Sequence, residues 1–114
     1  MAYFYDLQKV KEISGGDISF VKAIVETFVK EIPPDMEALQ IAIDNENHQM
    51  AYQFAHKMKP NIDLFGVDVL KQLKSIEKWS ATDRSASYIK PKLDEIVITL
   101  TAVLKELIVN FSLQ

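Results

Sequence analysis

Apolar residues recur along the chain at steps of three and four, the period of an α-helix, and almost nowhere at alternate positions. The pattern therefore predicts helices and no strands. A short first helix is expected from Tyr3 to Ile13, ending at Gly15-Gly16, where glycine can take the left-handed conformation that closes a helix. Asp17 is expected to cap the next helix, because its carboxylate can accept hydrogen bonds from the free amides of the first turn.

The second helix carries an apolar stripe that continues through two prolines. A true break would normally reset the phase of the stripe, so the pattern predicts one long helix bent at Pro33-Pro34. The stripe consists of Ile18, Val21, Val25, Phe28, Ile32, Met36, Leu39 and Ile43.

Three further helices are expected, from Asn47 to Phe65, from Val67 to Trp79, and a last one that reaches about Asn110. Pro91 falls in the first turns of the last helix, where a missing amide costs little. Four long amphipathic helices joined by short turns predict an all-α fold, an antiparallel four-helix bundle with the short N-terminal helix across one end. At 114 residues, the chain is expected to form a single domain over residues 1–114.

Composition narrows the class of protein. Hydrophobic residues make up 48% and charged residues 25%, which is typical of a folded globular chain, and the net charge of −3 argues against nucleic acid as a partner. The absence of cysteine excludes disulfides and thiolate chemistry and agrees with a cytoplasmic location. No apolar run is long enough for a membrane span, and no signal peptide is recognisable. We therefore expect a monomer without membrane contact, and the initiating Met1 favours a free-standing chain.

One residue of the third helix is a candidate for chemistry. On a helical wheel of about 100° per residue with Met50 at zero, the apolar face is centred near about 80°, whereas His56 falls at about 240°. His56 is thus expected to face solvent at mid-helix between Lys57 and Lys59, and no second histidine, carboxylate or hydroxyl is expected as a base around it. Near pH 7 an imidazole is partly neutral and can act as a nucleophile. The apolar face comprises Met50, Phe54, Ala55, Met58, Ile62 and Phe65.

A single exposed histidine often has no special role, so its position alone assigns no function. The run Ala55-His56-Lys57-Met58-Lys59-Pro60, followed by Leu64-Phe65-Gly66, resembles the signature of histidine-containing phosphotransfer (HPt) domains. That signature has a histidine, a variable residue, an aliphatic residue, a lysine and a small residue, with a glycine ten positions after the histidine. The similarity extends to Gly15-Gly16-Asp17 with Phe20, Phe28 and Pro33, Leu39 and Ala42, Leu70, and Ile76-Glu77.

This resemblance implies a phosphorelay intermediate. His56 would accept a phosphoryl group from a receiver-domain aspartate, as in a hybrid histidine kinase, and pass it to the receiver of a response regulator. Lys59 would stabilise the phosphate, and Gly66 would have a structural role near the site. The chain would bind no cofactor or metal, since the receiver supplies Mg²⁺, and it would have no kinase activity of its own. The implied docking face consists of Tyr52, Gln53, Lys57, Pro60 and Asp63.

The sequence departs from the family pattern at two places near the histidine. Pro60 stands where a small residue, usually glycine, is found, and it lacks the amide that would bond to the His56 carbonyl. We therefore predict a kink just after His56. Asp63, four residues after Lys59, is expected to compete with phosphate for that lysine.

Two other functions remain open. The chain could be an interaction module that binds a receiver or kinase without transferring phosphate. A metal-dependent helical enzyme is disfavoured, because the predicted core stripes hold no inward set of glutamate and histidine. His48 is expected to be solvated near a helix start, and Lys71, Lys74 and Lys78 form either a solvated helix face or a patch beside the docking face.

Overall fold

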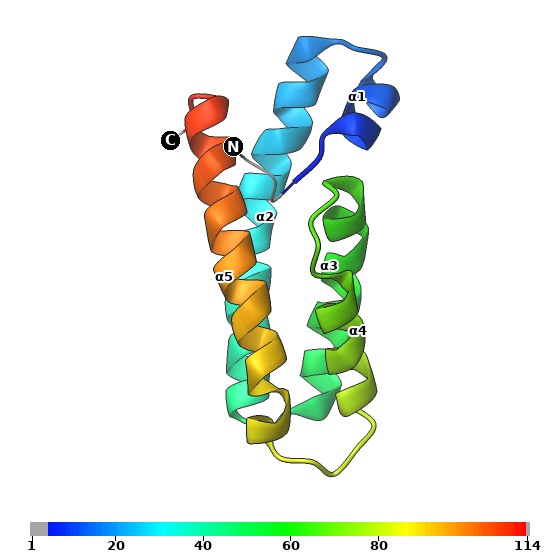
Figure 1. Cartoon of the computed structure of the whole chain (residues 1–114), viewed down its shortest axis with the longest axis vertical. Helices are drawn as coiled ribbons and strands as arrows, with labels where there is room; N and C mark the ends of the chain where they lie inside the picture. The colour runs from blue at the N-terminus through cyan, green and yellow to red at the C-terminus, as the bar shows by residue number, and fades with distance from the viewer. Residues whose placement is uncertain (1–4, 114) are drawn as a thin grey trace.

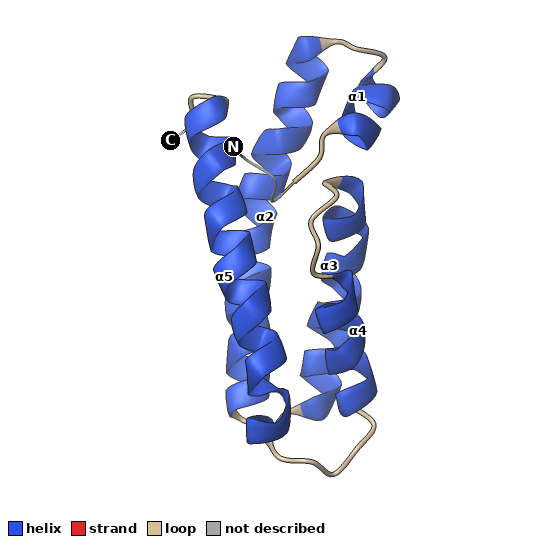
Figure 2. Ribbon diagram, in the orientation of Figure 1, coloured by secondary structure: helices blue, strands red, loops and turns tan. Residues whose placement is uncertain are grey.

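A computed structural model describes residues 5–113 and contains five α-helices and no strand within that range (Figure 2). The helices are α1 (Gln8–Ser14), α2 (Ile18–Asp44), α3 (His48–Leu64), α4 (Leu70–Trp79) and α5 (Ala86–Asn110). The predicted all-α class is confirmed. Over the described residues, no helix is both long enough and apolar enough to cross a membrane.

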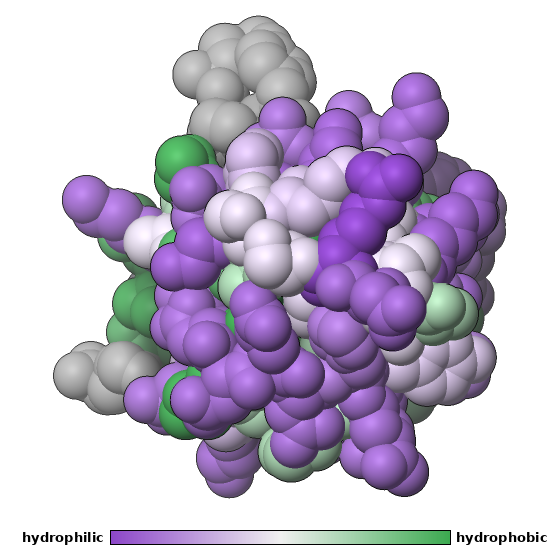
Figure 3. Space-filling model, turned by 90° about the horizontal axis from the view of Figure 1, so that it is seen from below, coloured by the Kyte–Doolittle hydropathy of each residue, from purple (hydrophilic) through white to green (hydrophobic). Residues whose placement is uncertain are grey.

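The four longer helices pack in a closed ring. α2 contacts α3 and α5, α4 contacts the same two helices from the other side, and α1 packs on α2. α2 and α4 run toward the end that holds the α4–α5 connection, whereas α3 and α5 run away from it (Figure 1). The molecule is elongated, about 47 × 23 × 22 Å, and the end with that connection presents a mostly hydrophilic surface (Figure 3).

The second helix begins and continues largely as predicted. Gly15 takes a left-handed conformation with a φ of 64°, and the Asp17 carboxylate accepts hydrogen bonds from the amides of Ser19 and Phe20. α2 then runs through Pro33-Pro34 without a break, so the prediction of one long helix is confirmed. Ile18, the first residue of the predicted apolar stripe, is 80% exposed, because this end of α2 extends past the ends of α3 and α5 (Figure 1).

The first helix starts later than predicted. Its expected start at Tyr3 lies outside the described residues, and residues 5–7 are not helical. The amide of Asp6 donates to the carbonyl of Phe65 at 2.8 Å, so this segment is held against the end of α3 instead of bonding within α1. The Asp6 carboxylate accepts from the amide of Gln8 at 2.9 Å, which satisfies a free donor at the start of α1.

The fourth helix also starts later, at Leu70 instead of Val67. After α3, Gly66 has a φ of +60°, and the amide of Val67 donates back to the carbonyl of Ile62. The left-handed Gly66 and this hydrogen bond close α3, so the backbone around Val67 forms the end of α3 and not the start of α4. A Cβ atom at Gly66 would lie 2.9 Å from the Asp6 Cβ, so glycine is required here both for its conformation and for the close approach of the N-terminal segment.

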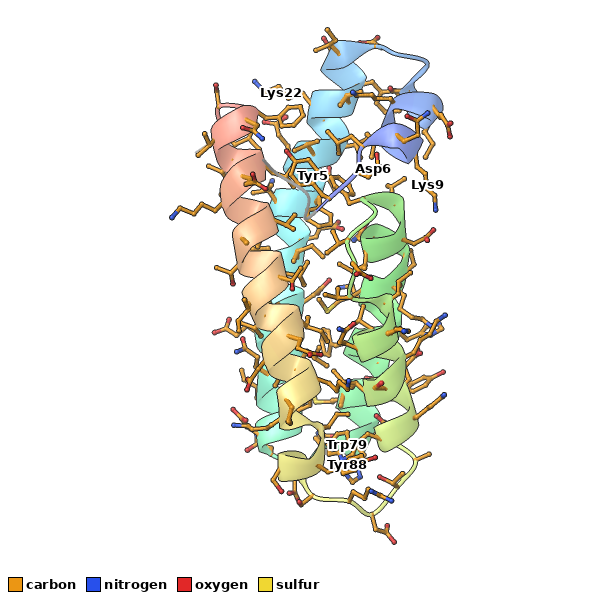
Figure 4. All side chains as sticks on the ribbon, in the orientation of Figure 1. Tyr5, Asp6, Lys9, Lys22, Trp79 and Tyr88 are labelled. Atoms are coloured by element: carbon orange, nitrogen blue, oxygen red, sulfur yellow. The ribbon has the colours of Figure 1, made fainter. Side chains whose placement is uncertain are left out.

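One continuous core fills the space between the helices. The rings of Phe28 and Phe65 stack with centroids 4.0 Å apart, joining α2 to the end of α3. At the other end, Trp79 is buried and its indole Nε1 donates to the carbonyl of Arg84, beside Tyr88 (Figure 4). The largest fully buried side chains are Trp79, Phe28, Phe65, Ile32, Leu39, Ile43, Met58, Ile62, Leu73, Ile76, Ile96 and Leu100.

Candidate functional site

The third helix presents His56 to solvent, as predicted. The side chain of His56 is 62% exposed near the middle of α3. The buried face is rotated slightly from the predicted one, because Ala51 is fully buried whereas Met50 is 38% exposed. Met50 was therefore wrongly placed in the core, but His56 still lies on the side of α3 away from the core. The buried residues of α3 are Ala51, Ala55, Met58 and Ile62.

A carboxylate lies against the imidazole, contrary to the expectation that none would. Glu77 of α4 has its Oε2 atom 2.9 Å from His56 Nδ1 and its Oε1 atom 2.9 Å from Lys59 Nζ. One half-buried carboxylate thus bridges the histidine and the lysine one turn further along α3. Because Glu77 accepts at Nδ1, a neutral His56 carries its proton there and leaves the Nε2 lone pair available.

A residue of α3 itself also contacts the ring of His56. Tyr52, one turn earlier, stacks on the imidazole with centroids 5.6 Å apart and an angle of 11° between the planes. Tyr52 is itself 46% exposed, so the stacked pair forms part of the surface. Glu77 and Tyr52 together define the orientation of an imidazole that remains open to solvent.

The electrostatics of Glu77 follow from these contacts. Burial by itself raises the pKa of Glu77, but hydrogen bonds from Lys59 and His56 outweigh that effect. The pKa of Glu77 therefore lies below its ordinary value of 4.5. At neutral pH the carboxylate is ionised, and it can stabilise a positive charge that develops on the imidazole.

Lys57, next to the histidine, is tied to a different helix. Its Nζ lies 2.9 Å from Oδ1 of Asp35 on α2, and Asp35 is only 5% exposed. The hydrogen bond and the charge of Asp35 raise the pKa of Lys57 above its ordinary value. Lys57 stays on the surface of the predicted docking face but is anchored to a buried carboxylate, since an unpaired charge at Asp35 would be costly.

Asp63 does not compete for Lys59, contrary to prediction. Its carboxylate pairs with Lys9 of α1 at 3.1 Å, while Lys59 pairs with Glu77. Lys9 reaches Asp63 because the N-terminal segment crosses the end of α3, where Lys9 and Asp6 lie (Figure 4). Pro60 is exposed, and α3 continues through it to Leu64.

His48 is not the solvated residue that was expected. As the first residue of α3 it is half-buried, and its ring meets Trp79 edge-on with centroids 4.2 Å apart. Its Nε2 atom is buried without a hydrogen-bond partner among the described residues. Between residues 5 and 113, no group of three or more histidine, cysteine, aspartate or glutamate side chains is arranged to hold a metal ion.

The sequence did not lead us to predict Glu77 or Asp35 at this site, although the position of each residue in its helix is informative. Asp35 follows Ile32 by three residues and precedes Leu39 by four, so it occupies a core position of α2. Glu77 follows Leu73 by four residues and therefore lies at the border of the buried stripe of α4. A charged side chain near the core needs a partner of opposite charge, but the helical period does not identify that partner.

In comparisons with known proteins, no family model, curated protein or solved structure matches this chain.

Replacing Glu77 with glutamine is expected to lower the reactivity of the His56 Nε2 atom as a nucleophile, because the carboxylate that holds the ring proton on Nδ1 is removed. The amide can donate to Nδ1, which would move the imidazole proton to Nε2 and remove the lone pair. The rate at which a small acylating reagent modifies His56 measures the effect, and ¹⁵N NMR of the His56 ring reports the tautomer. An unchanged rate together with an unchanged tautomer would show that Glu77 does not orient the ring.

The same substitution has an expected pH dependence. Because folding lowers the pKa of Glu77, its contribution to stability is present at neutral pH and is lost as the pH falls through the lowered pKa. The difference in unfolding free energy between the wild type and Glu77→Gln should therefore shrink as the pH falls below 4.5. Urea titrations at several pH values test this. A difference that grows toward low pH would contradict it.

Proposed function

We propose that this chain is a histidine phosphotransfer protein that carries a phosphoryl group on His56 between receiver domains. The observation that carries the proposal is the arrangement around the imidazole: an exposed ring whose Nδ1 atom faces Glu77 at 2.9 Å, with Lys59 held by the same carboxylate. The arrangement leaves Nε2 as the nucleophile on a rigid helix. The likeness of residues 55–66 to the HPt signature supports the same function.

The transfer step follows from this geometry. The Nε2 lone pair of His56 attacks the phosphorus of a receiver's aspartyl phosphate, an N–P bond forms, and the O–P bond breaks. The aspartate carboxylate leaves with the electron pair of the broken bond. The proton on Nδ1 stays in place, so the ring becomes positively charged while Glu77 accepts its hydrogen bond, much as a buried aspartate supports the histidine of a catalytic triad.

The reverse of this step returns the phosphoryl group to the aspartate of a second receiver. Lys59 neutralises part of the phosphoryl charge, and the receiver contributes Mg²⁺ and its acidic pocket. In-line transfer of this kind depends mainly on positioning and charge neutralisation, so the chain needs no nucleotide site and no kinase activity of its own.

For this function, α2 to α5 form an antiparallel four-helix bundle with α1 at one end, and the bundle works as a cytoplasmic monomer. Receivers, including that of a hybrid histidine kinase, would dock on the surface around His56. The proposed docking residues are all exposed, which supports their access to a partner: Tyr52, Gln53, Lys57, Pro60 and Asp63. Gly66 supports this region by letting the N-terminal segment cross the end of α3.

The test is phosphoryl transfer to the whole chain. When it is incubated with a phosphorylated receiver domain and Mg²⁺, we expect a label that is labile in acid and stable in alkali, located by mass spectrometry on the peptide that contains His56. Binding of receivers without any label would overturn the proposal in favour of an interaction module that does not transfer phosphate. A label elsewhere in the chain would also overturn it.

A further inference from the structure

The surface beside His56 is hollowed on the side toward α4. A shallow cavity of about 300 Å³ is lined from α3 by His56, Lys59, Pro60 and Asp63, and from α4 by Leu70 and Lys74. A water molecule in the liquid occupies about 30 Å³, so the cavity has room for a phosphoryl group on the imidazole together with several waters. Lys74 thus lines the same cavity as the proposed phosphoryl acceptor but comes from the neighbouring helix.

Some of the charged side chains around this cavity have ion-pair partners, and one does not. Lys59 is paired with Glu77 at 2.9 Å, and Asp63 is paired with Lys9 at 3.1 Å, so each of these charges is offset by a partner. Lys74 is exposed and makes no ion pair with any residue from 5 to 113. The cavity therefore has one positive charge in excess, supplied by α4.

We propose that Lys74 is a second phosphate-binding residue, which contacts the phosphoryl oxygens on His56 while Lys59 remains paired with Glu77. A phosphoryl group brings a charge of about −1.5 to −2 at pH 7, more than one lysine shared with a carboxylate can offset. Lys74 supplies the missing charge without disturbing the Glu77 contact that orients the ring. This inference rests on His56 being the phosphoryl acceptor.

The experiment compares charge removal at two positions of α4 in the whole protein. Phosphoramidate, a small phosphodonor that loses ammonia on transfer, is used as the probe, so that docking of a receiver does not enter the rate. Lys74→Gln is expected to slow labelling of His56 about fivefold, the size of one nearby charge contact at a solvated site. Lys74→Arg should keep most of the rate. Lys78→Gln is the matched control, because Lys78 is exposed on the same helix but does not line this cavity.

A second readout separates phosphate binding from a general structural effect. In ³¹P NMR titrations of the phosphorylated chain, a cation beside the phosphoryl group lowers its pKa, so the pKa should be higher in Lys74→Gln than in the wild type and Lys78→Gln. Equal labelling rates and equal titrations in the two glutamine variants would overturn the role of Lys74 and leave the proposed function standing. A wild type that takes no label from either phosphoramidate or a phosphorylated receiver would overturn both.

Discussion

His56→Gln is expected to abolish labelling of this chain by a phosphorylated receiver. Glutamine resembles histidine in size and polarity, and its amide can donate to the Glu77 carboxylate, so the local contact can be kept. It has no ring nitrogen with a free lone pair, however, and the N–P bond cannot form. The measurement is the acid-labile label after incubation with the donor, together with circular dichroism to show that the helices are retained.

His48→Gln is the matched control, because His48 is the only other histidine and lies eight residues earlier. Its ring packs against Trp79 and does not line the cavity at His56. This variant should therefore take the label at close to the wild-type rate. Persistent labelling of His56→Gln, or its loss in His48→Gln, would show that His56 is not the acceptor.

Phe28→Ala is expected to lower the free energy of unfolding by about 3–5 kcal/mol, as removal of a buried aromatic ring typically does. Phe28 is 1% exposed, and its ring stacks on Phe65, the residue that caps the C-terminal end of α3. The loss includes the hydrophobic transfer of the ring and the cavity left between α2 and α3. Since a domain of this size is stable by only about 5–15 kcal/mol, the variant should unfold at a much lower urea concentration.

Phe20→Ala provides the comparison for the same change on the same helix. Phe20 is 48% exposed, so its loss should lower the unfolding free energy by about 1 kcal/mol or less. Urea unfolding followed by circular dichroism and by the fluorescence of Trp79, the single tryptophan, measures both variants. Similar losses for Phe28 and Phe20 would mean that the stack of Phe28 on Phe65 does not hold the two helices together.

The sequence predicted most of the helices because their signals are local. The glycines after Ser14 and the Asp17 cap mark the first two boundaries, and the three- and four-residue period continues through Pro33-Pro34 as α2 does. One error occurs where a distant segment pairs with the backbone, and the other where a local turn closes a helix. Asp6 bonds to the carbonyl of Phe65 and delays α1, and the turn at Gly66 delays α4.

At the candidate site, the helical period alone predicts that His56 lies on the solvent side of a helix, because the period sets which residues face away from the core. It could not determine the partners of the charged residues. Glu77 meets His56 across 21 residues, Lys57 meets Asp35 across 22, and Lys9 meets Asp63 across 54. Only the packing of α1, α2 and α4 around α3 brings these charges together, since the pairing depends on how neighbouring helices are aligned along their axes. The packing of the helices therefore makes His56 an oriented imidazole on a carboxylate shared with Lys59, where the sequence predicted a histidine between two lysines and Asp63 as the competitor for Lys59.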